Sequence, residues 1–262
     1  MTAIYNKIGD NYDITRKADP EITATLAKLL NIQNSKHYLD IACGTGNYTI
    51  ELNKLGGKWY GFDQSQKMLD EATAKSSEIQ WSNFDIENLG YADNQFDGAI
   101  CSLAIHHFKD LDIAFSEVAR VIKSDSNLVI FTSTPEQMSH YWLAHYFPDM
   151  MQKSCAQMPS LSAIETALAK NQFTPLSIKP FFITEHLQDF FLYSGKQRPE
   201  IYLSEIVRNG ISSFKNFCTQ PEMHQGLRKL DGDIRSGAIH DLINQHHNRS
   251  GGDYLFVMAK KS

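Results

Sequence analysis

The chain has 262 residues, of which 42% are hydrophobic and 21% charged, a composition typical of a soluble globular protein. A net charge of −5 argues against general nucleic-acid binding, and no apolar run approaches the ~20 residues that span a bilayer. Four widely spaced cysteines form no CxxC pair, and the polar N-terminus lacks the apolar core of a signal peptide. We therefore expect a cytoplasmic protein without a membrane or nucleic-acid partner.

Helix-like and strand-like segments alternate through the first half of the chain. In chain order we expect a helix, a strand, a helix, a strand, a helix, two strands, a helix and a strand, over 18–31, 38–42, 47–54, 58–63, 66–75, 78–85, 96–105, 111–122 and 127–134. The helix over 111–122 should bury Ile113, Ala114, Val118 and Val121. Such alternation predicts parallel βαβ units with helices on both faces of the sheet.

The pattern changes after Thr134. Residues 135–160 are rich in aromatics and methionine, and a capping box at Ser162 and Glu165 should start a helix that runs to about Lys170. Strands are expected over 174–184 and 251–261, and 185–250 should be mostly helical. We predict one α/β domain over 1–262 with a doubly wound, Rossmann-like, mostly parallel seven-stranded sheet. Its core spans about 20–134, 160–184 and 251–262, and helical cap insertions span about 135–160 and 185–250.

A glycine-containing turn follows the first strand, in the segment DIACGTGNY over 40–48. Gly44 and Gly46 can adopt positive φ and let the backbone approach a ligand. Asp63 closes the second strand, 17 residues after Gly46, near the ~20 residues expected of an acid that accepts from both ribose hydroxyls. The turn therefore predicts a nucleoside ligand.

The charge around this turn argues against a dinucleotide. Thr49 stands where a dinucleotide-binding turn has its third glycine, and Asp40 lies just upstream of the turn. A carboxylate disfavours a phosphate and favours a cation. S-adenosylmethionine carries a ribose, a sulfonium and an ammonium but no phosphate, so its charge fits this turn better than that of NAD.

At these residues the chain resembles the class I S-adenosylmethionine-dependent methyltransferases of small molecules, such as those of ubiquinone and menaquinone biosynthesis. LDIACGTGNYT, YGFDQSQKML and NFDIENLGYADNQFDGAICSLAIHHF resemble the family's motifs in order and spacing. The resemblance implies that Asp63 binds ribose, Met68 packs near adenine, and Asp85 and the backbone of Ile86 read the ring. The resemblance also implies that the backbone around Ser102 and Leu103 binds the ammonium group of the cofactor's methionine part.

The same resemblance implies that the segment YNKIGDNYDITR folds over the cofactor, with Arg16 reaching its carboxylate. The full set of expected cofactor-binding residues is Tyr12, Arg16, Asp40, Ala42, Cys43, Gly44, Gly46, Asp63, Gln64, Met68, Asp85, Ile86, Ser102, Leu103 and His107.

His106 and His107 follow the fourth strand, at the rim where an acceptor should meet the methyl group. Either could act as a general base, or both could be structural. Among the cap aromatics, Tyr141, Trp142 and Tyr146 are candidates to bind substrate, although aromatics at helical spacing usually form core. We expect no metal, because the histidines at 240, 246 and 247 have few carboxylates nearby.

The predicted function is methyl transfer from S-adenosylmethionine to a small-molecule acceptor by in-line displacement. A base is needed only where the nucleophile must lose a proton. Two alternatives stay open: an NAD(P)-dependent oxidoreductase and a non-catalytic protein that binds S-adenosylmethionine. The protein is expected to be a monomer or a homodimer.

Overall fold

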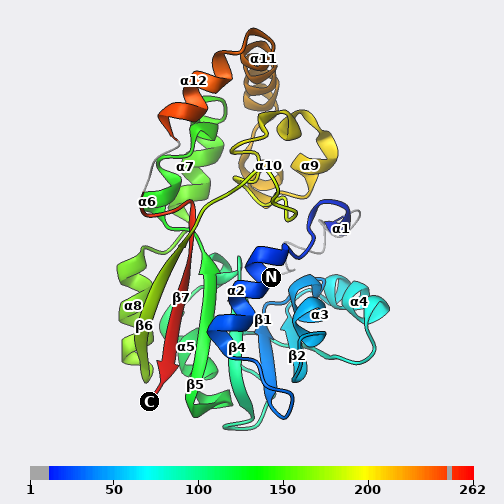
Figure 1. Ribbon diagram of the computed structural model, residues 1–262, viewed down its shortest axis with the longest axis vertical. Coiled ribbons are helices and arrows are strands. Elements are labelled where there is room, and N and C mark those ends of the chain that lie inside the picture. The colour runs from blue at the N-terminus through cyan, green and yellow to red at the C-terminus, as the bar shows by residue number, and fades with distance from the viewer. Residues whose placement is uncertain (1–11, 247–249) are drawn as a thin grey trace.

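A computed structural model of the chain describes residues 12–246 and 250–262. Its centre is a seven-stranded sheet with the strand order β3-β2-β1-β4-β5-β7-β6 (Figure 1). The strands are β1 (His37–Ile41), β2 (Lys58–Asp63), β3 (Gln80–Asn83), β4 (Phe96–Ser102), β5 (Ile122–Thr132), β6 (Phe173–Phe181) and β7 (Tyr254–Lys261). The first five strands pair in parallel, whereas β7 is antiparallel to both β5 and β6. The predicted Rossmann-like, mostly parallel sheet of seven strands is therefore confirmed.

The strand order reverses direction between β1 and β4. From β1 the chain moves outward through β2 to β3, then returns to the other side of β1 as β4. Parallel strands point their carboxyl ends to one edge of the sheet, and the reversal leaves a crevice there, where ligands bind in this architecture. The fold therefore places the ends of β1, β2 and β4 around one crevice.

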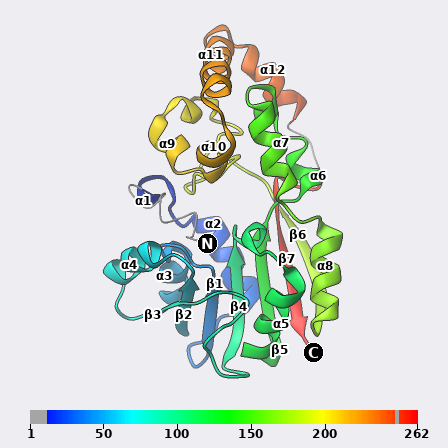
Figure 2. The same cartoon turned by 180° about the vertical axis from the view of Figure 1, so that it is seen from behind.

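Helices cover both faces of the sheet. α2 (Pro20–Leu30), α3 (Asn47–Asn53) and α4 (Gln66–Lys75) lie on the face shown in Figure 1, and α5 (Leu111–Val121) and α8 (Leu161–Lys170) lie on the face shown in Figure 2. α2 begins as the sequence predicts, because the carboxylate of Asp19 accepts from the backbone of Glu21 and Ile22 and Pro20 occupies the first turn.

Two details of the core helices differ from the sequence prediction. Ile113 is 46% exposed, because α5 turns Ala114, Phe115 and Val118 toward the sheet instead. Helix α8 begins two residues earlier than the predicted capping box, since the Ser160 hydroxyl, and not that of Ser162, accepts from the backbone of Ala163. Both helices still pack their apolar faces against the sheet.

Apart from α1 and the short 3-10 helix η2 (Ile105–His107) after β4, the remaining helices gather beyond the carboxyl ends of the parallel strands and form a cap (Figures 1 and 2). The first cap segment contains α6 (Pro135–Met138), η3 (Trp142–His145) and α7 (Pro148–Ala156). The second contains η4 (Pro199–Leu203), α9 (Glu205–Asn209), α10 (Ser212–Phe217), α11 (Gln220–Ser236) and α12 (Ala238–Gln245). The segments join through packing of α7 on α10, where the rings of Phe147 and Phe214 meet edge to face at 5.0 Å.

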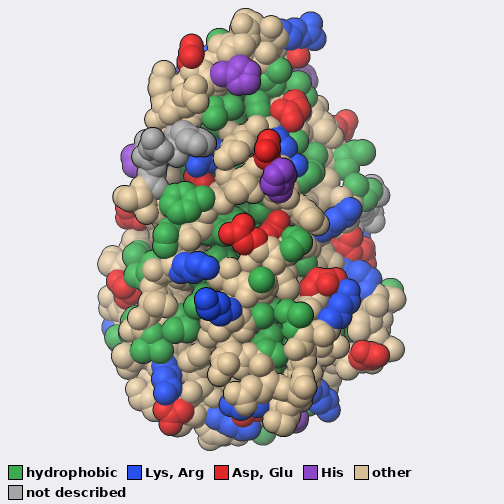
Figure 3. All heavy atoms as spheres, in the orientation of Figure 1, with side chains coloured by type: hydrophobic (Ala, Val, Ile, Leu, Met, Phe, Trp, Pro, Cys, Tyr) green, Lys and Arg blue, Asp and Glu red, His purple; other side chains and the backbone are tan. Residues whose placement is uncertain are grey.

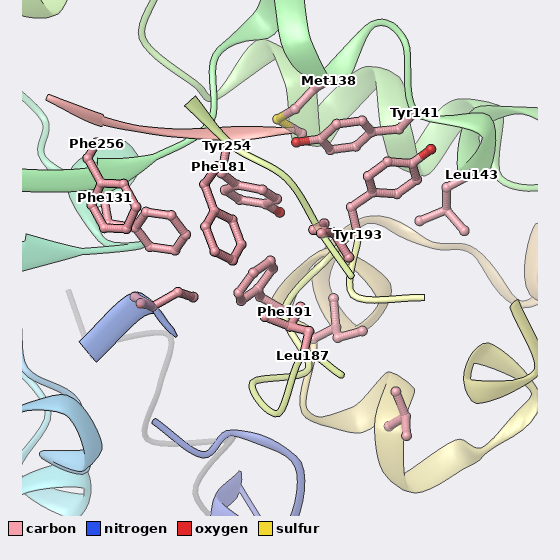
Figure 4. Packing of buried hydrophobic residues seen from close by; sticks show 14 of the residues in the cluster. Phe131, Met138, Tyr141, Leu143, Phe181, Leu187, Phe191, Tyr193, Tyr254 and Phe256 are labelled. Atoms are coloured by element: carbon pink, nitrogen blue, oxygen red, sulfur yellow. The ribbon is translucent and has the colours of Figure 1, made fainter. Parts of the chain in front are cut away.

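Aromatic side chains form the junction between sheet and cap (Figure 4). The ring of Phe131, on β5, meets that of Phe181 edge to face at 5.4 Å, and Tyr141 stacks on Tyr193 at 3.8 Å. A buried ion pair lies in the same region: the Lys196 ammonium contacts both oxygens of Asp253 at 2.7 and 2.9 Å. The junction thus combines aromatic packing with a partnered buried charge, so the cap is held on the sheet by specific contacts.

A short helix, α1 (Tyr12–Thr15), lies between the cap and α3 (Figure 1). The Asp13 carboxylate accepts from the side chains of Thr45, Asn47 and Lys75 at 2.6–2.8 Å. These contacts hold α1 above the turn that follows β1. In the part of the chain that the structure describes, no helix combines the length and apolar character needed to cross a membrane.

Candidate cofactor and acceptor site

One cavity lies between the carboxyl ends of the strands and the cap. Its core half is lined from the turn after β1, from the end of β2 and from α1, and includes Asp40, Gly44 and Asp63. Its other half is lined from the ends of β4 and β5 and from the cap, and includes His107 and Phe191. The cavity is therefore continuous from the glycine turn to the cap.

The two glycines of the turn have different environments. Both have positive φ, +56° at Gly44 and +74° at Gly46. A Cβ at Gly46 would lie 2.4 Å from the indole ring of Trp81, whereas a Cβ at Gly44 would meet no atom within 4 Å among the described residues beyond its chain neighbours. Gly46 therefore serves close packing at the start of α3. Gly44 leaves its backbone open to the cavity.

Asp63 closes β2 with both carboxylate oxygens directed to backbone amides. Its Oδ2 accepts from the Gly44 amide at 3.0 Å, and its Oδ1 accepts from the Ser65 amide at 2.8 Å. Burial raises the pKa of Asp63, while the amide bonds act in the opposite direction. A third backbone amide, that of Gln64, also bonds to the carboxylate. A carboxylate has about four lone-pair sites, so Asp63 can still accept a hydrogen bond from a ligand in the cavity.

Asp40 is a second carboxyl on the cavity, only 3% exposed. Its Oδ2 accepts from the Thr49 hydroxyl at 2.5 Å. Burial is the main cause that raises the pKa of Asp40 to about 7, with the Thr49 bond lowering it and the nearby Asp63 raising it. Among the described residues only Thr49 bonds to this buried carboxyl, and a positively charged ligand would offset the cost of burying its charge.

Arg16 joins α1 to the cap. Its Nε donates to Oδ1 of Asp189 at 2.6 Å, and Asp189 is 2% exposed. The other oxygen of Asp189 accepts from the hydroxyl of Tyr48, on α3, at 3.1 Å. Asp189 thus ties together α1, α3 and the segment that leads into the second cap insertion. The sequence offered no signal for this contact, because 173 residues separate its two partners.

The end of β4 contributes Ser102, Leu103, His106 and His107 to the cavity. Leu103 has a positive φ of 55°, which turns the chain sharply at this point. Within the described residues, neither Ser102 Oγ nor His106 Nδ1, both buried, has a hydrogen-bond partner. Burial lowers the pKa of His106 well below its usual range and that of His107 to about 4, so both imidazoles are neutral at pH 7.

Comparison with known proteins agrees with this geometry. A family model described as a methyltransferase domain matches residues 39–130. A demethylmenaquinone methyltransferase of Oceanobacillus iheyensis is 26% identical over 183 residues, which cover 66% of this chain and 75% of that protein. One from Lactobacillus johnsonii is 35% identical over 118 residues, covering 41% of this chain and 48% of that protein.

A solved structure extends the similarity to nearly the whole chain. It is a putative methyltransferase from an antibiotic biosynthesis pathway of Anabaena variabilis ATCC 29413, 29% identical, with a TM-score of 0.84 over 94% of this chain and 99% of that one. Residues 39–130 therefore form a methyltransferase domain, and the chain as a whole is similar to a putative methyltransferase. The cofactor of this chain is therefore S-adenosylmethionine, as the sequence predicts.

Most of the predicted cofactor-binding residues of this methyltransferase lie on the cavity. They are Tyr12, Arg16, Asp40, Ala42, Cys43, Gly44, Asp63, Met68, Ser102, Leu103 and His107. Four others do not line it: Gly46, Gln64, Asp85 and Ile86. Asp85 instead accepts from the Glu87 amide at 3.0 Å, and Ile86 packs in the core between the sheet and α5. An adenine-reading role for Asp85 and Ile86 stays a prediction.

Of the segment expected to cover the cofactor, residues 5–11 lie outside the described residues.

The three cap aromatics expected to bind substrate make hydrogen bonds within the cap and at its junction with the sheet, and a substrate-binding role for them stays a prediction. Tyr141 donates to the backbone oxygen of Asp253, Trp142 Nε1 donates to that of Lys196 at 3.0 Å, and Tyr146 donates to Asp233 at 2.8 Å. None of the three lines the described cavity. The cap residues that do so include Met138, Gln157, Met158, Phe191, Leu192 and Ile211. The sequence does not distinguish the two sets, since aromatic and other apolar residues occur in both.

Candidate metal ligands do not cluster in the described part of the methyltransferase. No group of three or more His, Cys, Asp or Glu side chains there is arranged to hold a metal ion. His240 and His246 lie on α12 and just after it, and position 247 lies outside the described residues.

Proposed function

We propose that the cavity binds S-adenosylmethionine in its core half and a small-molecule acceptor in its cap half. The observation that carries the proposal is the continuity of the cavity from the glycine turn to the residues contributed by the cap. A methyl donor and an acceptor must be held in line with each other, and a single cavity with two chemically distinct halves provides that arrangement.

The core half has the groups that this cofactor needs. Asp63 would accept from the ribose hydroxyls, and Gly44 would let the backbone approach the ligand. Asp40 would face the positive end of the cofactor, and the thioether of Met68 would pack near the adenine. Tyr12 and the backbone at Ser102 and Leu103 would complete the enclosure. The structure commits Arg16 to Asp189, so its predicted bond to the cofactor carboxylate would have to share the guanidinium with that partner.

S-adenosylmethionine supplies a methyl group that is already activated by the sulfonium. The acceptor atom forms its bond to this carbon as the carbon–sulfur bond breaks, and the residues around the cavity orient the two molecules and exclude water. His106 and His107 line the cavity, but burial lowers the pKa of both, which makes them neutral and weakly basic. A general-base role for either one therefore stays a prediction, and it is needed only if the nucleophile must lose a proton.

A small acceptor suits the enclosed cap better than a macromolecule does. Lys and Arg side chains are interspersed with Asp and Glu on the face shown in Figure 3, and the chain's net charge is −5. Electrostatic attraction of nucleic acid depends on a basic surface, which this composition does not favour. The demethylmenaquinone methyltransferases match over about half to three quarters of their length, so their named substrate is one candidate acceptor here. A cytoplasmic location and a monomer or homodimer stay predictions.

Two measurements test the proposal. Calorimetry should detect binding of S-adenosylhomocysteine, and metabolite extracts incubated with methyl-labelled S-adenosylmethionine should yield a labelled small molecule. Binding of NADH without binding of S-adenosylhomocysteine would overturn the proposal in favour of an oxidoreductase. Binding of S-adenosylhomocysteine without transfer to any component of the extracts would favour the non-catalytic alternative.

A further inference from the structure

The short helix α1 contacts elements on both sides of the cavity. On the core side, the Asp13 carboxylate accepts from Thr45 and Asn47, at the glycine turn, at 2.6 and 2.8 Å. On the cap side, α1 packs against α9, and Figures 1 and 2 show it between α9 and the helices α3 and α4. Because a helix of four residues is not stable alone, contacts of this kind hold α1 in place.

One group of contacts joins the end of α1 to residues 187–192, which we call the strap. A β-bridge pairs Arg16 with Asp189, and the Phe190 amide donates to the Thr15 carbonyl at 2.9 Å. The Arg16 guanidinium also forms its ion pair with the Asp189 carboxylate, whose side chain is 2% exposed. Backbone and side-chain contacts thus fix the strap to the end of α1 at one place.

The strap also forms part of the cap half of the cavity. Its residues Phe191 and Leu192 line that half. Burial is the main cause of the low pKa of His106, which lines the same half, and the charges of His107 and Arg16 lower it further. Arg16 therefore lies close to groups of the cap half while its ion pair holds the strap.

A further contact uses the space left by a glycine. The Thr15 side chain lies over Gly210, where a Cβ would be 2.2 Å from the Thr15 Oγ1. Thr15 is 4% exposed and β-branched, so its side chain has little freedom to rotate away from an added methyl group. Gly210 has a helical φ of −79°, so alanine would cause no backbone strain there. The next residue, Ile211, lines the cap half, so this contact joins α1 to the same wall as the strap does.

We propose that Thr15, Asp189 and Gly210 are positioning residues that couple the two halves of the cavity through α1. Tyr12 and Arg16 line the cavity, so a cofactor in the core half would stabilise α1 in its position. α1 would in turn fix the strap and the start of α10, so that the cap half is completed after the cofactor binds. Coupling of binding free energies is reciprocal, and an acceptor would therefore also tighten the binding of the cofactor.

The inference rests on the proposed function, because it assigns the core half to the cofactor and the cap half to the acceptor. It adds the residues through which one half would control the other, and an order in which the cofactor precedes the acceptor. These contacts join segments that are far apart in the chain, so they have no local signature in the sequence.

Hydrogen exchange with and without saturating S-adenosylhomocysteine tests the coupling. The reference is α8, which lies on the other face of the sheet from α3, because ligand binding also slows exchange that requires global unfolding (Figure 2). Relative to α8, we expect the ligand to slow exchange at least about fivefold at the Phe190 amide and at residues 211–213. Protection confined to the core half would overturn the inference. Failure of S-adenosylhomocysteine to bind in calorimetry would count against the proposed function instead.

Substitutions at glycine test whether the coupling passes through α1. Gly210→Ala places a methyl group against Thr15 Oγ1, so the protection of Phe190 and of residues 211–213 should be lost at a ligand concentration that saturates the variant. Adding Thr15→Ala removes Oγ1 and leaves the Thr15 Cβ at 3.5 Å, an ordinary contact, so the double variant should recover the protection. Gly232→Ala is the matched control, because a Cβ there meets no atom within 4 Å among the described residues, and it should behave as wild type.

The outcomes of these variants are decisive in either direction. Equal protection in Gly210→Ala and wild type, or no recovery in the double variant, would overturn the inference. If Gly210→Ala does not fold, Asp189→Asn takes its place, because it weakens the hold on Arg16 without adding bulk. Protection of Phe190 that is unchanged in Asp189→Asn would overturn the inference as well.

Discussion

Individual residues of the cofactor half could be predicted from the sequence because their roles follow from local chemistry. A buried strand that ends in an acid, followed by a glycine turn, has few structural solutions, and Asp40, Gly44 and Asp63 all lie on the cavity. Gly46 shows the limit of such reasoning. It has the same backbone conformation as Gly44, but its lack of a side chain serves the packing of Trp81, a residue on another strand.

The two glycines should respond differently to substitution by alanine. Gly46→Ala should lower the free energy of unfolding by more than about 2 kcal/mol, because the new methyl group overlaps Trp81 and φ is positive. Gly44→Ala should cost only about 1–2 kcal/mol, since only the backbone strain applies, but it should weaken S-adenosylhomocysteine binding at least tenfold. Urea unfolding and calorimetry on the two variants measure both effects. Equal affinity of Gly44→Ala and wild type would remove Gly44 from the cofactor site.

Asp63 should contribute to binding because its carboxylate lies on the cavity. Asp63→Asn keeps one acceptor oxygen, so we expect S-adenosylhomocysteine affinity to fall by roughly 1–3 kcal/mol. Asp97→Asn is a matched control, because Asp97 also accepts from a backbone amide, that of His37 at 2.9 Å, but does not line the cavity. Both variants should lose some stability, and only Asp63→Asn should lose affinity by calorimetry. A comparable loss of affinity in the control would mean that the effect is not local.

At the level of elements, hydrophobic periodicity predicted where the helices and strands of the sheet domain lie, but it did not predict which elements contact each other. The strands after residue 170 and the helices α2 to α5 were expected at these places, since each has a cap or an apolar stripe that acts locally. The orientation of Ile113 and the position of Ser160 differed by a small rotation or shift, to which periodicity is insensitive. Contacts between distant elements, such as Arg16 with Asp189, have no local signature at all.

The Arg16–Asp189 pair should control how firmly α1 closes the cofactor half. Asp189→Asn removes the charge partner of a guanidinium that is only 15% exposed, so we expect lower stability and faster dissociation of S-adenosylhomocysteine. The exposed pair of Lys170 with Asp112 supplies the control: Asp112→Asn should change stability by less than about 1 kcal/mol and leave dissociation unchanged. Stopped-flow displacement measures the rates. An unchanged rate in Asp189→Asn would show that the pair is structural only.

At the scale of the whole molecule, the cap is the part that the sequence describes least. Its helices could be expected from composition, yet the rings of Tyr141, Trp142 and Tyr146 pack inward while Met138, Met158 and Phe191 face the cavity. Which apolar residue faces a cavity depends on how two insertions, separated in sequence by α8 and β6, come together. Each insertion buries residues of the other. The cavity-lining residues of one insertion therefore could not be predicted from its own sequence pattern alone.

The cavity also makes the stability of the whole chain depend on pH through Asp40. Its pKa in the folded protein, about 7, lies above the ordinary value of 3.8. Between these two pH values the folded state retains a proton that the unfolded state has released, so the contribution of Asp40 to stability falls as the pH rises from about 4 to 7. Asp40→Asn keeps an acceptor for the Thr49 hydroxyl without the charge. The ligand-free variant should therefore gain more Tm over wild type at pH 8 than at pH 5.

The same carboxyl should favour the cationic cofactor over its product. Above pH 7 Asp40 is ionised in the ligand-free protein and attracts the sulfonium of S-adenosylmethionine, which S-adenosylhomocysteine lacks. The ratio of the two affinities should then shift toward S-adenosylmethionine as the pH rises from 6 to 8 in wild type and stay constant in Asp40→Asn. Calorimetric titration of both ligands at each pH measures the ratio. A variant that is no more stable than wild type at pH 8, or a ratio with the same pH dependence in both proteins, would show that Asp40 does not hold a buried charge facing the cofactor.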